Sequence, residues 1–235
     1  GSIHLRSRAP SSTFTISASP QLNIWQGTPP LDQPGAEGDW EMIYTISPVM
    51  THGARNWIRD RAREFKQAGI DASFAFSMEC YLLPMAMAAC YWDGEPVFLP
   101  IPSHQMHFGP RVRNYLKQMY KECADEIAAA GLPIVLQFGE TQWWYFPNAS
   151  GMPFYDDDTK AAFQARYGRP LHRFLANTDS PNHDIESADF LRDRIWEYCA
   201  EVISYVRRFH PSAVFECLWP LDANQGKPAP DQGFR

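Results

Sequence analysis

Three glutamates stand at or near the ends of segments whose residue pattern predicts β-strands. Glu79 and Glu140 each follow an apolar run, and Glu216 lies in the apolar run from 213 to 219. A carboxylate among apolar neighbours is costly unless it is paired or its pKa is raised, and a raised pKa suits general acid–base chemistry. The sequence therefore predicts a carboxylate-lined pocket with Glu79, Glu140 and Glu216 as its catalytic candidates.

Aromatic and amide side chains follow the same predicted strand ends. Aromatic residues in loops at strand ends are typical of binding surfaces, because a flat aromatic ring offers a large contact area to a ligand. Packing of the loop is the alternative for the aromatic residues, and turn formation is the alternative for Asp222 and Asn224. The predicted substrate-binding residues of this group are Gln142, Trp143, Trp144, Tyr145, Trp219, Asp222 and Asn224.

Two histidines follow a further predicted strand as His104-x-x-His107. A metal site needs more ligands, and the spacing fixes none, so we predict no metal and assign both histidines to substrate binding at the rim. Asp156-Asp157-Asp158 opens a predicted helix, where an N-cap and two carboxylates complement the helix dipole. N-capping is therefore preferred to calcium binding for these three residues.

Strand and helix patterns alternate along the chain from residue 40 onward. Such alternation predicts a parallel sheet, and Gly69 and Gly131 mark helix ends. Residues 13–19 alternate like one more strand. The predicted strands are 42–47, 72–79, 96–101, 133–138 and 213–219, and the predicted helices are 52–68, 110–130, 157–167 and 187–209.

The strand at 72–79 has two unlike faces. Phe74 and Phe76 share the large face with Met78, whereas Ser73 and Ala75 lie on the small face. A (β/α)8 TIM-barrel-like fold predicts this difference, because helices cover the outside of the barrel and the lumen is narrow. The strands fall short of eight, so we expect an incomplete barrel in a piece of a longer protein. Residues 1–38 are predicted to be an N-terminal extension or linker, and 39–235 the barrel domain.

The composition is that of a globular protein: 45% of the 235 residues are hydrophobic and 20% are charged. A net charge of −6 without a basic stripe argues against nucleic acid. There is no membrane-length apolar run and no recognisable signal peptide. No Gly-x-Gly-x-x-Gly or phosphate loop follows a strand, so no nucleotide cofactor is expected.

The strand-end glutamates resemble those of clan-A glycoside hydrolases, which are (β/α)8 barrels. The resemblance implies that Glu140, on the fourth visible strand, is the acid/base and that Glu216 is the nucleophile, with Glu79 in support. The family has an Asn before the acid/base where this chain has Gly139. Two motifs, Gly-Glu-x-Gln-Trp-Trp-Tyr and Leu-Trp-Pro-Leu-Asp-x-Asn, also resemble barrel domains of bacterial or phage-tail-associated proteins.

Two functional hypotheses follow. The first is a carbohydrate-binding, glycoside-hydrolase-like barrel without a cofactor, which cleaves an oligosaccharide or polysaccharide with paired glutamates. The alternative is a non-catalytic carbohydrate-binding or structural barrel module of a phage-tail-like or cell-surface assembly, with other domains of a longer chain as partners. A barrel fold alone does not fix function. Gly139 favours the alternative, because the glycoside hydrolases have an Asn at this position.

Overall fold

The structure is a computed structural model that describes residues 3–7, 15–17, 49–50, 52–80, 83–98, 103–139, 141, 143, 151–176 and 179–218. Its elements are β1 (Ile3–Ser7), β2 (Thr15–Ser17), α2 (His52–Ala68), β3 (Ala72–Phe76), β4 (Glu79–Cys80), η1 (Met85–Met87), β5 (His104–Gln105), α3 (Pro110–Ala130), β6 (Val135–Phe138), α4 (Asp157–Tyr167), η2 (Pro181–His183), α5 (Ile185–Arg207) and β7 (Val214–Cys217). The α/β alternation predicted from the sequence is confirmed from α2 to β7.

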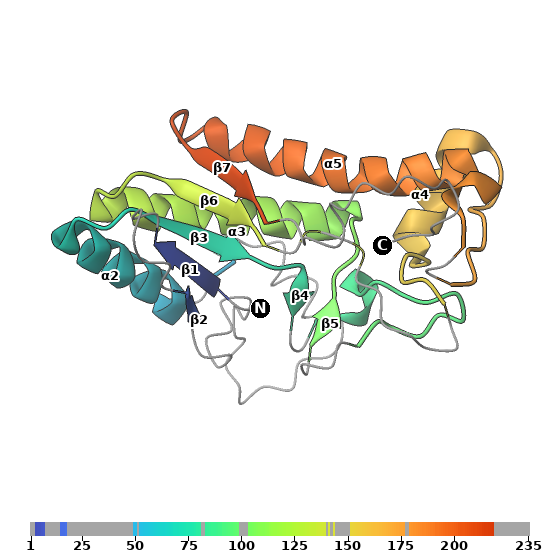
Figure 1. Cartoon of the computed structure of the whole chain (residues 1–235), viewed down its shortest axis with the longest axis horizontal. Helices are drawn as coiled ribbons and strands as arrows, with labels where there is room; N and C mark the ends of the chain where they lie inside the picture. Colours follow the sequence, from blue (N-terminus) through green and yellow to red (C-terminus); the bar gives the residue numbers. More distant parts are fainter. Residues whose placement is uncertain are drawn as a thin grey trace.

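The main sheet has the strand order β2-β1-β3-β6-β7 (Figure 1). β3, β6 and β7 are parallel neighbours, and Phe138 of β6 pairs with Phe76 on one side and Cys217 on the other. β1 runs antiparallel to β3. Among the described residues the sheet is open and does not close into a barrel. The structure therefore confirms an α/β fold with parallel central strands.

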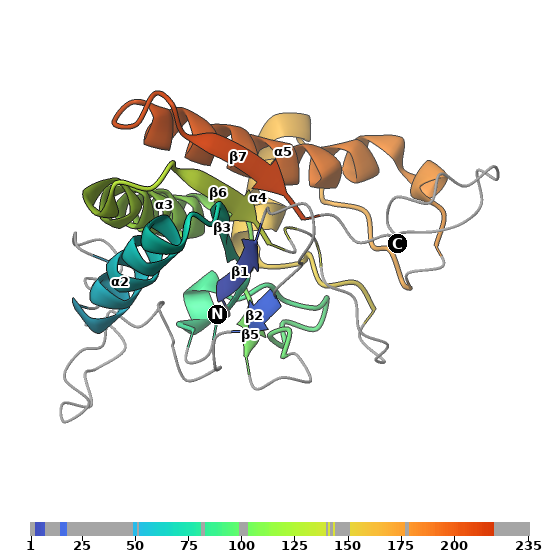
Figure 2. The same cartoon turned by 60° about the vertical axis from the view of Figure 1, so that its left-hand side comes forward.

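The face of the sheet that carries large side chains packs against the helices, as predicted. Phe76 meets Tyr120 of α3 edge-on at 4.9 Å between ring centroids, and Phe138 meets Tyr198 of α5 at 5.6 Å. Figures 1 and 2 show α2, α3 and α5 running alongside the strands. The opposite face carries Ser73 and Ala75, both about 1% exposed, so it is also buried.

Two buried carboxylates of α3 hold α2 and the segment before it against the rest of the fold. Glu122 accepts hydrogen bonds from the backbone N–H groups of Val49 and Met50, at 2.7 and 2.9 Å. Glu126 accepts from Nε of Arg55 at 2.8 Å and from Nε of Arg59 at 2.6 Å. These bonds compensate the cost of burying two carboxylates between packed helices.

The helix ends follow the sequence signals. α2 and α4 have the predicted bounds. Gly131, with φ of +73°, ends α3 in the left-handed region that favours glycine. Asp156 caps α4 by accepting from the N–H of Thr159 at 2.8 Å, so the N-capping interpretation is confirmed.

Some strand predictions differ from the structure. The described part of 96–101 holds only isolated bridges, Cys90 with Pro96 and Phe98 with His104, because this segment belongs to a small antiparallel excursion with β4 and β5. The predicted strand at 42–47 lies outside the described residues. No helix among the described residues is long and apolar enough to cross a membrane.

Candidate functional site

The predicted nucleophile Glu216 lies within β7, one residue before its end. Its neighbour across the parallel ladder is Gln137 of β6. Nε2 of Gln137 donates a hydrogen bond to Oε2 of Glu216 at 3.1 Å. The Glu216 carboxylate is therefore held on the face of the sheet turned away from α3 and α5, beside an amide.

Glu79 lies beyond the carboxyl end of β3. It forms β4 with Cys80, and Glu79 pairs with Gln105 of β5. The side chain is buried, with 4% of the residue exposed. β3 therefore ends at Phe76, short of the predicted strand end at Glu79, and Glu79 lies in the two-stranded excursion that follows β3.

Trp143 lies between three apolar clusters of the protein. Its ring meets Phe108 edge-on at 4.6 Å and Phe154 at 5.7 Å, and its Nε1–H donates to the carbonyl of Leu191 at 3.3 Å. These contacts fit the packing alternative for this residue. A role of Trp143 in sugar binding stays a prediction.

Most of the remaining predicted site cannot be placed, because seven of its residues lie outside the described residues. They are Glu140, Gln142, Trp144, Tyr145, Trp219, Asp222 and Asn224. The described neighbour Gly139 donates its N–H to the carbonyl of Phe76 at 2.9 Å. A Cβ at position 139 would lie 3.2 Å from that carbonyl oxygen, so the strands leave little room for the Asn found in clan-A enzymes.

The two histidines of the predicted rim, His104 and His107, lie in different surroundings in the structure. His104 of β5 packs edge-on against Phe98 at 4.9 Å, and burial lowers its pKa. His107 is buried and lines a cavity of about 610 Å³. The two side chains therefore do not form a common His-x-x-His site, and among the described residues no group of three or more His, Cys, Asp or Glu is arranged to hold a metal.

The cavity lies on the side of the sheet where the parallel strands end. Its walls come from the β3–α3 connection, from the segment before α4, and from the first turns of α3 and α4. Figure 1 shows both helices beginning on the side toward which the parallel strands point. In TIM barrels this side carries the ligand sites. The lining residues are Met85, Ala86, Ala88, Cys90, Gly94, His107, Pro110, Arg111, Tyr155, Asp156, Asp157, Asp158 and Lys160.

His107 is fixed by hydrogen bonds at both ring nitrogens. Nδ1 accepts from the N–H of Gly109 at 2.8 Å, so Nε2 carries the proton of the neutral ring and donates to the carbonyl of Ala86 at 3.0 Å. Oδ2 of Asp158 lies 3.6 Å from Nε2. A Cβ at position 109 would fall 2.5 Å from Cε1 of His107 and would overlap the Asp158 carboxylate, so this close approach requires glycine.

Sequence patterns did not reveal the cavity. Arg111 and Lys160 resemble ordinary surface residues of helices, and Tyr155 resembles a core residue. They meet only because the two helix starts and the β3–α3 connection fold together. The aromatic residues after the predicted strands gave a general indication that this side of the sheet carries a binding surface, and of the residues that line this cavity only His107 was among the predicted site residues.

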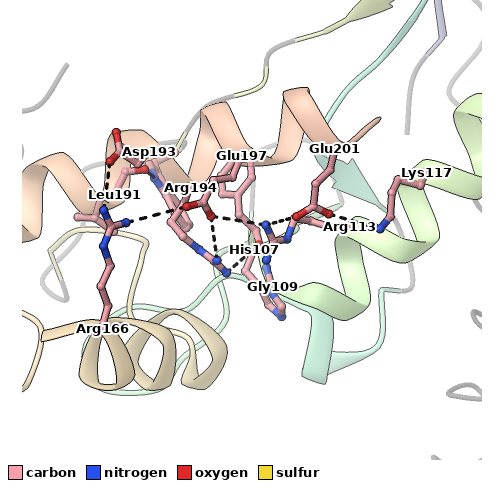
Figure 3. A network of polar contacts seen from close by, with 12 residues as sticks. His107, Gly109, Arg113, Lys117, Arg166, Leu191, Asp193, Arg194, Glu197 and Glu201 are labelled. Atoms are coloured by element: carbon pink, nitrogen blue, oxygen red, sulfur yellow. Dashed lines mark hydrogen bonds and ion pairs between the residues drawn. The ribbon is translucent and has the colours of Figure 1, made fainter. Parts of the chain in front are cut away.

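Behind the cavity, a charged network joins α3, α4 and α5 (Figure 3). Arg194 is 5% exposed and donates from Nη2 to the carbonyl of Phe108 at 2.9 Å, next to His107. Burial lowers the pKa of Arg194, and the nearby Arg113 lowers it further. Arg113 in turn lies 2.7 Å from Glu201. The network holds α3, α4 and the connection before α3, which form the walls of the cavity, against α5.

A layer of parallel strands flanked by long helices, with a cavity at the strand ends, defines an α/β protein. A family model described as "Non-contractile tail sheath protein TIM barrel" matches residues 35–207, well over half of the chain. The chain belongs to this family. No curated protein and no solved structure matches it. The resemblance to phage-tail-associated barrels is thereby confirmed, whereas the glycoside hydrolase clan receives no support.

Proposed function

We propose that this chain is a structural barrel module of a phage tail, and that it contributes to a sheath around a non-contractile tail. The observation that carries the proposal is the family match over residues 35–207. It favours the alternative hypothesis drawn from the sequence over the catalytic one.

The packing of the described helices is consistent with a rigid module. The buried carboxylates of α3 bind α2 and the segment before it. The ion pairs of Arg113 and Lys117 with Glu201 join α3 to α5. Charge-assisted hydrogen bonds between packed helices restrict their relative motion. A rigid module suits a repeated subunit, because every copy must present the same surfaces to its neighbours.

Electron microscopy of phage tails that contain the chain tests the structural role. An epitope tag on the chain, detected with gold-labelled antibody, is expected to decorate the shaft of the tail along its length. Tails assembled without the chain are expected to lack the corresponding outer density while keeping their tube. Label confined to the tail tip, or tails of unchanged width, would contradict a sheath role.

Activity assays test the catalytic hypothesis separately. Wild type, Glu140→Gln and Glu216→Gln are compared on a panel of glycosidase substrates, with Glu64→Gln on the exposed side of α2 as the matched control. We expect no turnover by any of the four. Turnover by wild type and the control that is lost in both site variants would restore the paired-glutamate mechanism.

A further inference from the structure

We propose that the cavity between the first turns of α3 and α4 binds a small neutral saccharide, of one or two sugar rings. The volume of about 610 Å³ falls within the usual range for small-molecule sites. The site differs from the one predicted around Glu140 and Glu216, and of the predicted residues it includes only His107. It also stands apart from the sheath role, since a structural subunit can carry a ligand site.

Charged side chains of both signs line the cavity, and one of them, Asp156, is already occupied in capping α4. Asp157 and Asp158 contribute carboxylates, whereas Arg111 and Lys160 contribute cations. An anionic ligand would meet the aspartates, and a cationic ligand would meet Arg111, Lys160 and the positive ends of two helices. A hydroxyl group both donates to a carboxylate and accepts from a cation, so a neutral polyhydroxylated ligand matches the lining of both signs.

Two of these charged side chains can turn to a ligand at little cost. Lys160 pairs with Asp157 at 2.9 Å, but the Asp157 side chain is fully exposed. An exposed ion pair of this kind contributes little to stability. Sugar hydroxyls can therefore replace this contact without loss to the fold.

The walls of the cavity are fixed before any ligand arrives. His107 is held at both ring nitrogens, and the hydroxyl of Tyr155 donates to backbone carbonyls at 3.2 Å while accepting from the N–H of Phe174. The N–H of Tyr155 donates to the carbonyl of Cys90 at 2.8 Å, which joins the two connections that form the walls. A preformed site avoids the cost of ordering loops on binding.

Apolar side chains complete the lining. Met85, Ala86 and Ala88 lie on the wall formed by η1 and the residue after it. Sugar rings carry C–H groups between their hydroxyls, and these groups pack on such a surface. The combination of an apolar wall with charges of both signs is the basis for assigning a saccharide.

Methyl NMR of the whole chain, labelled at alanine, locates the ligand. The probes are maltose, cellobiose, lactose and N,N′-diacetylchitobiose at millimolar concentration, with inorganic phosphate and spermidine as charged comparators. We expect at least one disaccharide to shift the methyl signals of Ala86 and Ala88, with Ala200 on α5 unchanged. No shift with any saccharide, or shifts produced only by phosphate or spermidine, would overturn the proposal.

A double variant provides the second measurement. Arg111→Gln with Asp157→Asn removes one charge of each sign from the cavity, and we expect affinity for the bound saccharide to fall roughly tenfold or more. The matched control is Arg192→Gln with Asp189→Asn on α5, which makes the same chemical changes at an exposed ion pair. Equal affinity of the double variant and wild type would place the sugar elsewhere and reject this site. Decoration of tails by the double variant tests the sheath role independently.

Discussion

Replacing Glu126 by alanine tests whether the carboxylate clamp between α2 and α3 holds the fold together. Glu126 is 2% exposed and accepts hydrogen bonds from Arg55 and Arg59. Hydrogen bonds to charged groups contribute about 1.5–3 kcal/mol each. Both arginine side chains are about one third exposed, so water compensates part of the loss. We expect the free energy of unfolding to fall by about 2–4 kcal/mol, close to the range for breaking a buried pair.

Urea unfolding followed by circular dichroism measures the change, provided that the dependence on urea concentration keeps its slope. Glu64→Ala on α2 is the control, because its pair with Arg61 is largely exposed and should contribute less than about 1 kcal/mol. Arg55 and Arg59 replaced together by alanine would leave Glu126 buried and unpaired, and we expect an equal or larger loss. A change below about 0.5 kcal/mol for Glu126→Ala would refute the reasoning, since that is the range of ordinary surface substitutions.

Three further predictions concern stability. Ser73→Ala should raise the free energy of unfolding by about 1 kcal/mol, because the buried hydroxyl has no hydrogen-bond partner among the described residues; destabilisation in urea would contradict this. Gly109→Ala should cost about 1–3 kcal/mol, since the added methyl would overlap the His107 ring, and an unchanged melting temperature would argue against the overlap. Hydrogen bonds from Arg169 lower the pKa of Asp184 below its ordinary value of 3.8. The stabilisation is therefore present above pH 3.8 and is lost as pH falls through the lower pKa of Asp184 in the folded state. Asp184→Asn should flatten this loss of stability in acid, measured as melting temperature across a pH series. An unaltered profile would exclude Asp184 as its source.

Several features could be read from the sequence because neighbouring residues determine them. α2 and α4 begin and end where predicted, since apolar periodicity, an N-cap at Asp156 and glycines after helices act within a few residues. The two faces of β3 were also predictable, because side chains alternate along any strand and Phe74 and Phe76 require burial. The family resemblance to phage-tail barrels rested on local motifs in the same way.

Other features were decided only by the tertiary structure. β1 lies antiparallel beside β3, and strand partners depend on contacts between residues far apart in the chain. Glu126 resembles a surface residue of an amphipathic helix until α2 packs over it with two arginines. The cavity joins Arg111, Tyr155 and Lys160 from separate segments, so no single stretch of sequence indicates it. Local periodicity determines the elements, whereas long-range packing determines which side chains meet.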